Sequence, residues 1–424
     1  MSTPHPTRPD VWPLRFISVE AVSGLVLLAA AAIALACANS PLSHAYESLW
    51  QQRLSFGVPF LPAYDLRFWV NDGLMTVFFL LVGLEIRREI HDGTLSDPRV
   101  ATLPLIAAAG GVLVPALLYL LVTILVGSTP LARRGWAIPT ATDIAFAVGV
   151  LSLTGRAPPA LRMLLLTLAI ADDVAAILII AFYYSGGIVA GQFLVVAAGV
   201  VLVLLLQALS VQSALAYALP GAVIWVGMLR AGVHPTVTGV LLGLLTPATA
   251  VFGRRARQRP APRAVPSAAD RLDAPRAPDP PVVRVEAMLH PYVAFGIMPL
   301  FAFANAGVSL KGLELGGGEP LAVVAGIVLG LVLGKPLGIM LAALVAVRLK
   351  LAELPDGVRW RQLLLLGILG GIGFTMSVFI ANLAFEDRRL LAAAKFAVLV
   401  GSALAATLAL TLGRSQSAAL KLSA

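Results

Sequence analysis

Two adjacent aspartates are the residues of this sequence best suited to carry out chemistry. Asp172 and Asp173 lie within LRMLLLTLAIADDVAAILIIAFYY, residues 161–184, which contains no other charge after Arg162. A run of this length and apolarity predicts a membrane-spanning helix of about 30 Å, with both carboxylates near its middle. On insertion scales each aspartate costs about 2.5–3.5 kcal/mol at that depth. A helix that only had to span the membrane would not carry them, so the pair predicts a functional site.

A lysine in another apolar run provides a counter-ion for one of these aspartates. Lys335 lies in GLVLGKPLGI, too deep to reach the membrane surface easily. An ion pair with either Asp172 or Asp173 would lower the cost of burying both charges, and the residues alone do not decide between the two. The other carboxylate would then have no fixed partner and could bind a proton or a small cation. Mutually exclusive binding of proton and cation at one carboxylate is the minimal device for exchange.

Two segments contain residues that interrupt a helix. In WAIPTATDIAFAVGVLSL, residues 136–153, a proline and two threonines weaken the first half of the helix. The break would expose backbone carbonyls and the Thr142 hydroxyl as oxygen ligands, while Asp143 would compensate the partial positive charge of helix amino termini. In GILGGIGFTMS, residues 367–377, four glycines predict a second break. Close packing of small residues between helices is the alternative interpretation of those glycines.

The composition places these segments in a polytopic membrane protein. Of the 424 residues, 59% are hydrophobic and only 12% are charged, and the mean hydropathy is +0.90. The net charge of +9 does not indicate nucleic-acid binding, because the basic residues lie between apolar runs rather than on one face. The single cysteine, Cys37, excludes an intramolecular disulfide. We therefore expect membrane lipids as surroundings and no nucleic-acid partner.

Twelve apolar segments predict an all-α chain with twelve transmembrane helices. A cleaved signal peptide is the alternative for the first segment, but its apolar run exceeds the roughly 7–15 residues of a signal sequence, so we expect a retained helix. The eighth segment is short. The twelve segments are residues 16–38, 68–89, 100–126, 136–153, 161–184, 193–209, 214–229, 233–245, 287–308, 322–347, 363–384 and 391–412.

The loops predict the orientation of a single membrane domain covering residues 1–424. Of the 31 Lys and Arg residues, 21 lie in the two ends and the even-numbered loops, and 8 lie in the odd-numbered loops. The positive-inside rule then makes the polar residues 1–15 and the tail, 413–424, cytoplasmic. Residues 253–284 are rich in arginine and proline, which predicts a disordered cytoplasmic loop with weak attraction to anionic lipids.

Six of the stretches in this sequence resemble the NhaA family of sodium/proton antiporters. They are WAIPTATDIAFAVGVLSL, LTLAIADDVAAI, AGVHPTVTGV, PLFAFANAGVSL, LGKPLGI and GILGGIGFTMS, and the resemblance extends over residues 16–412. It implies twelve helices in which spans three to five and ten to twelve form inverted three-helix repeats, with broken middle members that cross near the membrane midplane. Broken helices are a known feature of this family, so the two predicted breaks are not independent of the resemblance.

The resemblance also implies an activity and a setting. The expected activity is electrogenic export of Na⁺ or Li⁺ in exchange for more than one H⁺ by alternating access, with activation at alkaline pH. The expected location is the bacterial inner membrane, and the expected assembly is a homodimer, with residues 39–67 as the candidate contact. We expect a transporter rather than an enzyme, with no cofactor besides the transported ions.

Matching positions assign roles to the residues at membrane depth. Asp173 corresponds to the aspartate that binds the cation, and Asp172 to the neighbour that pairs with the lysine, here Lys335. Thr142 corresponds to the ligand on the broken helix, and Asp143 to its charge-compensating neighbour. The resemblance therefore predicts that Asp173, Asp172 and Thr142 hold Na⁺ or Li⁺.

Further positions match residues nearer the membrane surfaces. Asp72 corresponds to an acid in the cation passage, and His234 to a histidine linked to the pH response. The pH response itself is associated with a charged cytoplasmic cluster, matched here by Glu85, Arg88, Glu286 and His290. Charges at the end of a span can also reach the membrane surface without any such role. The sequence departs from the family at Val283 and Ala287, where relatives can carry basic residues, and in the length of the arginine-rich loop before them.

Two other classes of membrane protein use aspartates at depth. An intramembrane aspartyl protease would need its Gly-x-Gly-Asp context, but Asp143 follows Thr-Ala-Thr and Asp172 follows Ala-Ile-Ala. A sodium-coupled solute symporter of related fold remains the alternative prediction. It would need a larger polar cavity for an organic substrate, and the sequence offers few side chains to line one.

Overall fold

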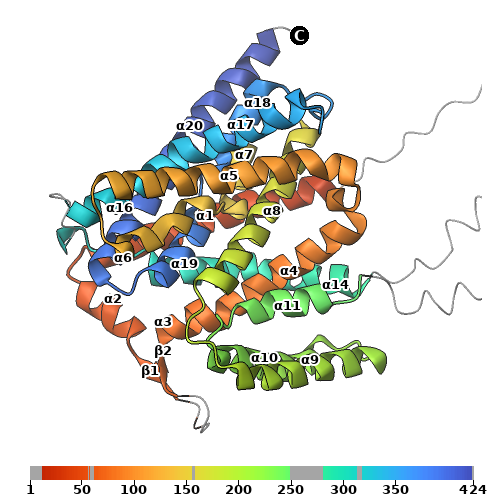
Figure 1. Cartoon of the computed structure of the whole chain (residues 1–424), viewed down its shortest axis with the longest axis vertical. Helices are drawn as coiled ribbons and strands as arrows, with labels where there is room; N and C mark the ends of the chain where they lie inside the picture. Colours follow the sequence, from red (N-terminus) through yellow and green to blue (C-terminus); the bar gives the residue numbers. More distant parts are fainter. Residues whose placement is uncertain are drawn as a thin grey trace, which may run out of the picture.

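The computed structural model describes residues 12–422, except 56, 58–61, 155–157, 249–279 and 313–317, and is almost entirely helical (Figure 1). The α-helices are α1 (Trp12–Ala38), α2 (Ser43–Trp50), α3 (Leu66–Phe68), α4 (Met75–Asp92), α5 (Pro98–Leu125), α6 (Pro130–Arg133), α7 (Ile144–Leu153), α8 (Pro159–Tyr183), α9 (Phe193–Ala208), α10 (Ala218–Ala231), α11 (Val237–Leu245), α14 (Pro281–Tyr292), α15 (Met298–Asn305), α16 (Gly318–Leu329), α17 (Lys335–Arg348), α18 (Trp360–Gly370), α19 (Phe374–Ala384) and α20 (Arg388–Leu422). The π-helical segments are η1 (Trp69–Leu74), η6 (Val293–Ile297) and η8 (Gly330–Gly334). The 3₁₀ segments are η2 (Thr94–Ser96), η3 (Arg134–Thr140), η4 (Ala190–Gln192), η5 (Ala214–Tyr217) and η7 (Leu310–Gly312).

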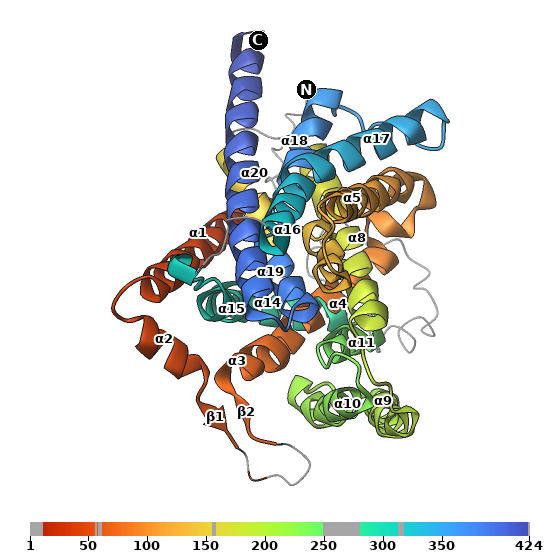
Figure 2. The ribbon, with the colours of Figure 1, turned by 60° about the vertical axis from the view of Figure 1, so that its left-hand side comes forward.

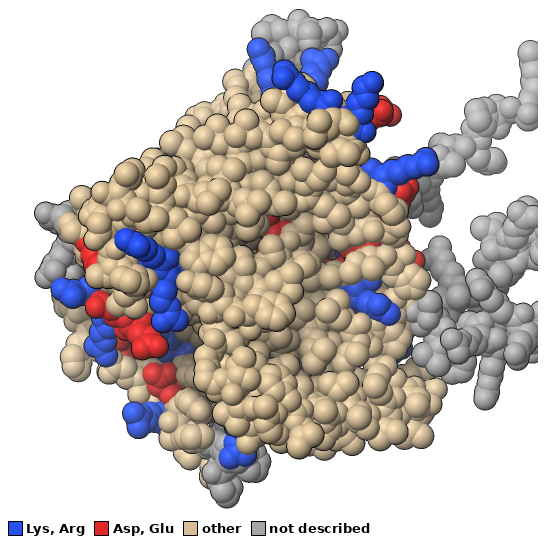
Figure 3. Space-filling view, in the orientation of Figure 1, with Lys and Arg blue, Asp and Glu red and all other residues tan. Residues whose placement is uncertain are grey.

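The helices have the length and composition of membrane spans. Among the described residues, 8 continuous helical runs are long and apolar enough to cross a bilayer, or up to 11 if each of 3 bent pairs is one span. The face drawn in Figure 3 is a broad uncharged surface, with charged side chains gathered towards its edges. The all-α polytopic fold is therefore confirmed. All twelve predicted segments contain helix, but α11 is only 9 residues long, so the count of twelve stays a prediction.

Helix starts follow local sequence rules. Asp97 caps α5 by accepting a hydrogen bond from Arg99 N at 2.9 Å, and Pro98 occupies the first helical turn, where its missing N–H costs nothing. Pro281 likewise begins α14, which therefore starts inside the loop predicted for residues 253–284. Val282 N donates to Pro247 O at 3.3 Å, so both ends of that loop lie together. The rest of the predicted loop lies outside the described residues, apart from Pro280.

Two other predicted boundaries differ from the structure. Helix α1 begins at Trp12, within the segment expected to be a polar amino terminus. Helix α20 continues to Leu422, through most of the predicted tail 413–424. The tail holds Ala, Leu, Lys and Gln, which have high helix propensity, and neither glycine nor proline follows Gly413 to end the helix.

The fourth and eleventh spans are both broken, as predicted. Helix axes bend by 48° between η3 and α7 and by 44° between α18 and α19. The breaks, residues 141–143 and 371–373, meet each other: Asp143 N donates to Ile372 O at 2.7 Å. Backbone groups released by one break are thus satisfied by the other, which is how non-helical backbone is tolerated inside a membrane.

The third and tenth spans pack closely side by side, beside the broken helices. Helix α5 runs along α17 and η8 (Figure 1). A Cβ atom on either Gly110 or Gly338 would overlap the carbonyl oxygen of the other, so glycine is needed at both positions for this close approach. The π-helical segment η8 immediately precedes Lys335, and π-helical turns inside α-helices frequently occur at functional sites.

A small β-hairpin distinguishes one end of the bundle from the other. Strands β1 (Arg53–Leu54) and β2 (Tyr64–Asp65) pair antiparallel, with Arg53 opposite Asp65, and project beyond the helices (Figure 2). We call this the hairpin end, which the Lys and Arg distribution predicts to lie outside the cell. The opposite end, where α4 ends and α14 begins, we call the loop end.

Candidate ion-binding site

Asp143 lies where two helix amino termini meet at the breaks. Its Oδ1 accepts from Phe146 N at 3.0 Å, which caps α7. Its Oδ2 accepts from Thr375 N at 3.1 Å and from Thr375 Oγ1 at 2.5 Å, at the start of α19. A carboxylate at a helix amino terminus offsets the partial positive charge of the helix dipole, and here one carboxylate serves two helices. Asp143 is 2% exposed, so the two amino termini supply the compensation that its own charge needs.

Hydroxyl groups satisfy the other ends of the broken helices. The Thr142 hydroxyl lies 2.9 Å from Gly370 O at the carboxyl end of α18, and Ser377 Oγ donates to Ile138 O at 2.7 Å near the end of η3. Phe374 N donates to Ser402 Oγ on α20 at 3.0 Å. Sequence reasoning missed Thr375, Ser377 and Ser402. The sequence offered one indication of a role: Thr375 and Ser377 follow the glycine run of the second break, just as Thr142 follows the proline near the first break.

The lysine holds Asp172 and not Asp173. Lys335 Nζ lies in direct contact with Asp172 Oδ2, and both side chains are completely buried. The Thr142 hydroxyl lies 2.7 Å from the same oxygen. Because this hydroxyl has one proton and two acceptors, Asp172 Oδ2 and Gly370 O, it links the ion pair to the broken helix. The structure thus makes the choice between the two aspartates that the residues alone had left open.

Asp173 lies beside this ion pair as an acid without a fixed partner on Oδ1. It is 1% exposed, and its Oδ1 atom has no hydrogen-bond partner among the described residues. The Oδ1 atom of Asp172 is also unpartnered. The negative charges of Glu85, Asp172 and Asp143 act on Asp173, and Lys335 provides the opposing positive charge. Buried carboxylate oxygens without donors, in a site with excess negative charge, suit a proton or a hard cation with oxygen ligands.

Asp72 and His234 form a second pair of titratable side chains in contact, towards the hairpin end. Asp72 Oδ1 lies 3.3 Å from His234 Nε2, and His234 Nδ1 lies 2.7 Å from Thr236 Oγ1. Trp225 Nε1 donates to the Asp72 backbone oxygen at 3.2 Å and to Thr76 Oγ1 at 3.0 Å. The resemblance links His234 with the pH response. The structure places its side chain against Asp72, because the turn between α10 and α11 lies beside η1.

The loop end brings together most of the predicted charged cluster. Arg88 Nη1 lies 2.6 Å from Glu286 Oε1, and the Glu286 side chain is only 6% exposed. His290 follows Glu286 by one turn of α14, and the charge of Arg88 acts on it. Glu85 lies one turn before Arg88 on α4, where its charge acts on Asp173. Glu85 therefore lies on the same helix as Arg88 and close enough to Asp173 for its charge to act there.

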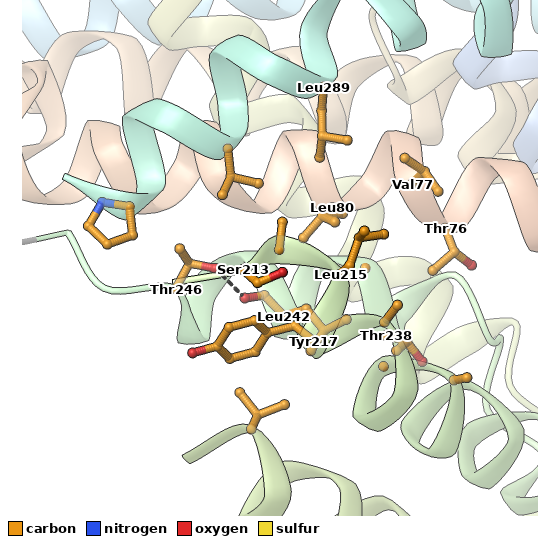
Figure 4. Close-up of a pocket in the computed structure, with 18 of the residues that line it drawn as sticks. Thr76, Val77, Leu80, Ser213, Leu215, Tyr217, Thr238, Leu242, Thr246 and Leu289 are labelled. Carbon is orange, nitrogen blue, oxygen red and sulfur yellow. Dashed lines mark hydrogen bonds between the residues drawn. The ribbon is translucent and has the colours of Figure 1, made fainter. Parts of the chain in front are cut away.

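A large cavity lies apart from the aspartates. It has a volume of about 1150 Å³ and is lined mainly by apolar side chains of α4, α10, α11 and α14, among them Val77, Leu80, Leu242 and Leu289 (Figure 4). None of the residues that line it belongs to the aspartate site. Among the described residues, Arg284 is the one charged residue that lines it. This cavity therefore gives an organic solute no place beside Asp172 and Asp173.

Known proteins are similar to this sequence over nearly its whole length. Residues 14–412 match the family model described as Na⁺/H⁺ antiporter 1. The chain is 52% identical over 422 residues to a protein of Cupriavidus necator named Na(+)/H(+) antiporter NhaA, covering 94% of this chain and 88% of that protein. It is 51% identical over 422 residues to Na(+)/H(+) antiporter NhaA 2 of Pseudomonas putida, covering 94% and 92%. A protein of Sorangium cellulosum with the latter name is 52% identical over 419 residues. The chain is thus a multi-pass membrane protein that belongs to the Na⁺/H⁺ antiporter 1 family.

Proposed function

We propose that this protein exports Na⁺ or Li⁺ in exchange for protons. The observation that carries the proposal is the asymmetry of the two aspartates: Lys335 holds Asp172, while Asp173 keeps an unpartnered oxygen beside it. A site of this kind binds either a proton or a cation, because both neutralise the same carboxylate. The names of the relatives, which describe Na⁺/H⁺ antiporters, agree with this chemistry.

The proposed cycle is alternating access around Asp173. Deprotonated Asp173 binds the cation from the cytoplasm, together with Asp172 and the Thr142 hydroxyl. The assembly then opens towards the hairpin end, where protons displace the cation and return the neutral site. Asp143 keeps the two broken helices together while the site changes its exposure, since it bonds to both.

We propose further that more than one proton enters per cation, so that net positive charge moves inward. Each such charge gains about 2.3 kcal/mol per 100 mV of membrane potential, which can drive the export of the cation against its gradient. Activation at alkaline pH would follow from the cluster of Arg88, Glu286 and His290, since protonation of acids and histidine alters its ion pairing. Glu85, one turn before Arg88 on α4, would pass a change in this cluster to Asp173, because its charge acts on that carboxylate.

The proposed setting is the bacterial inner membrane, with both termini in the cytoplasm. We propose a homodimer that forms through the projecting β1–β2 hairpin, whose strands are each bonded to one neighbour only among the described residues. A two-stranded ribbon presents free edges that a second copy of the chain can extend. A sodium-coupled symporter would need a polar cavity at the aspartates, and the cavity described above supplies none there.

Transport in proteoliposomes tests the proposal. Na⁺ or Li⁺ added to vesicles holding the wild-type protein should move protons across the membrane, and potential-sensitive dyes should report charge movement. Asp173→Asn should abolish this movement, because an amide cannot trade a proton for a cation. Asp356→Asn, the same change in an exposed loop, should leave it intact. Retained exchange in well-inserted Asp173→Asn protein would refute the assignment.

A further inference from the structure

Four polar residues, two of them buried and two half-buried, form a cluster towards the hairpin end that the proposed exchange does not use. The carbonyl Oδ1 of Asn305 accepts from Asn382 Nδ2 at 3.0 Å, from Asn71 Nδ2 at 3.4 Å and from Lys395 Nζ at 3.5 Å. Asn305 Nδ2 in turn donates to Asn71 Oδ1 at 2.7 Å. Asn305 is 1% exposed and Lys395 is 8% exposed. Three donors from three different helical segments thus converge on one amide oxygen, which we call the amide cluster.

An aromatic layer lies directly beneath the amide cluster. Phe301 precedes Asn305 by one turn of α15, and Phe379 precedes Asn382 by one turn of α19, so each ring lies one turn deeper on the same side of its helix. The two ring centroids are 6.2 Å apart, and Phe79 lies 5.3 Å from Phe379. All three rings are at most 1% exposed. The polar amide cluster therefore covers a layer of buried aromatic rings.

The hydrogen bonds of the amide cluster differ in which helices they connect. Asn71 and Asn305 lie on η1 and α15, outside the two three-helix repeats. Asn382 and Lys395 lie on α19 and α20, within the second repeat. The bonds from Asn382 and Lys395 therefore cross between a repeat and the helices around it, whereas the bonds between Asn71 and Asn305 do not. A movement of the repeats past the surrounding helices must break the first two bonds and can leave the others intact.

Lys395 is a buried lysine held by an amide rather than by a carboxylate. The charged groups that act on it are Arg67 and Glu47, which already pair with each other at 2.9 Å. Among the described residues no acid forms an ion pair with Lys395. Helix α15 ends at Asn305 and α19 ends at Ala384, so two helix carboxyl termini, with their partial negative charge, lie near the ammonium group. This arrangement is the counterpart of Asp143, an acid near two helix amino termini.

We propose that the amide cluster is the closure of the cation passage at the hairpin end, and that Asn382 and Lys395 hold it shut by bonding to Asn305. This inference rests on the proposed exchange by alternating access. Asn71 is next to Asp72, the acid predicted to line the passage, so the cluster lies where a cation leaving the site would pass. The four residues are positioning residues: they set which side the site faces and do not bind the cation.

The closure predicts a bias in the conformational equilibrium. Each crossing bond stabilises the conformation in which the hairpin side is closed, so its removal should increase the population open to that side. The apparent affinity for a cation added from the loop end should fall in proportion, because the competent fraction of protein is smaller. Affinity measured from the hairpin side should rise. A residue that only supports folding would not shift the two affinities in opposite directions.

A buried reporter cysteine tests the closure. In a Cys37→Ala background, Ala302→Cys places a thiol one turn deeper than Asn305 on α15, at a position that is 3% exposed. A membrane-impermeant maleimide is added outside right-side-out vesicles, with no sodium or pH gradient. The test variants are Asn382→Ala and Lys395→Met. The matched control is Asn39→Ala, whose side chain donates to Leu35 O on α1 and to Val308 O, and accepts from Leu310 N, in the segment between α15 and α16.

Labelling of the reporter should rise about two- to tenfold in both test variants, the population change expected from losing one hydrogen bond. It should not change in Asn39→Ala. Equal labelling in all variants would overturn the closure, and so would an equal rise in the control, which would show general loosening. If Asn382→Ala does not insert, Lys395→Met carries the test alone. The labelling needs no transport, so absence of Na⁺-driven proton movement in the wild type would refute the exchange without deciding the closure.

Discussion

The ion pair between Lys335 and Asp172 is the feature whose removal has the most definite energetic consequence. Both side chains are fully buried, and Lys335 is the single cation in contact with Asp172 among the described residues. Lys335→Met keeps most of the apolar volume of the side chain and leaves the carboxylate with one remaining donor, the Thr142 hydroxyl. Breaking a buried pair by removing one partner typically costs about 3–5 kcal/mol, because an uncompensated buried charge remains. We expect a loss of that size in the stability of the purified protein.

A double-mutant cycle separates this effect from loss of packing. Asp172→Asn alone should also destabilise, because the ammonium group loses its counter-ion. The double variant should lose much less than the sum of the two single losses, since removing both charges removes the desolvation penalty as well. Unfolding in detergent by heat or denaturant, at constant pH, measures all four proteins. Lys311→Met, at an exposed lysine in the segment after α15, serves as the control for losing a lysine.

Two outcomes would refute this reasoning. If Lys335→Met costs no more than Lys311→Met, the buried ammonium does not stabilise the fold through Asp172. If the two single losses simply add in the double variant, the two side chains do not interact energetically, whatever their separation. Either result would also remove the physical reason for assigning different roles to Asp172 and Asp173.

Three further predictions concern the parts around the site. Asp143→Ala should lower stability by about 2 kcal/mol, because it removes the caps of two helices at about 1 kcal/mol each. Asp143→Asn should lower stability less, because the amide keeps an acceptor oxygen. Thermal unfolding measures both variants. Burial alone would raise the pKa of Glu47, but hydrogen bonds and charge from Arg67 hold that pKa below its usual value. The ion pair therefore stabilises the protein at neutral pH, and this contribution is lost as the pH falls through the lowered pKa. Because Glu47 is 45% exposed, solvent screening keeps the contribution below about 1 kcal/mol, and Glu47→Gln should remove that part of the acid sensitivity in a pH series of unfolding midpoints. Deleting residues 255–277 should leave transport in vesicles intact, because hydrogen-bonded residues hold the two ends of that loop together; a well-inserted but inactive deletion would show that the loop has a role.

The spans were predictable because burial in lipid depends on local composition, so the apolar runs locate the helices without knowledge of their neighbours. The breaks were predictable for a similar reason, since proline in the fourth span and glycines in the eleventh act on their own backbone. The residues at which the segments begin and end were less predictable. The predicted ninth segment begins at residue 287, whereas α14 begins at Pro281, where Val282 N also bonds to Pro247 O, a contact that no local pattern reveals.

Charge balance alone predicted that one of the two aspartates pairs with the lysine. A buried lysine and two buried aspartates require a pair, but the choice of Asp172 depends on how α8 faces η8 and α17. Thr375 was missed because its partner, Asp143, is 232 residues away and a threonine in a helix is common. Lys395 had the same signal as Lys335, a lysine within an apolar run, yet its partner is the amide of Asn305 rather than an acid. The position of His234 followed from the turn before α11 and not from its sequence motif.

Proton release on cation binding tests the central claim most directly. Na⁺ added to purified protein in weakly buffered solution should release protons from the wild type, because cation and proton compete for Asp173. The same addition to Asp173→Asn protein should release none, whereas Asp356→Asn should behave as the wild type. Release of the same number of protons by Asp173→Asn, or cation binding by the wild type without any release, would contradict exchange at this carboxylate.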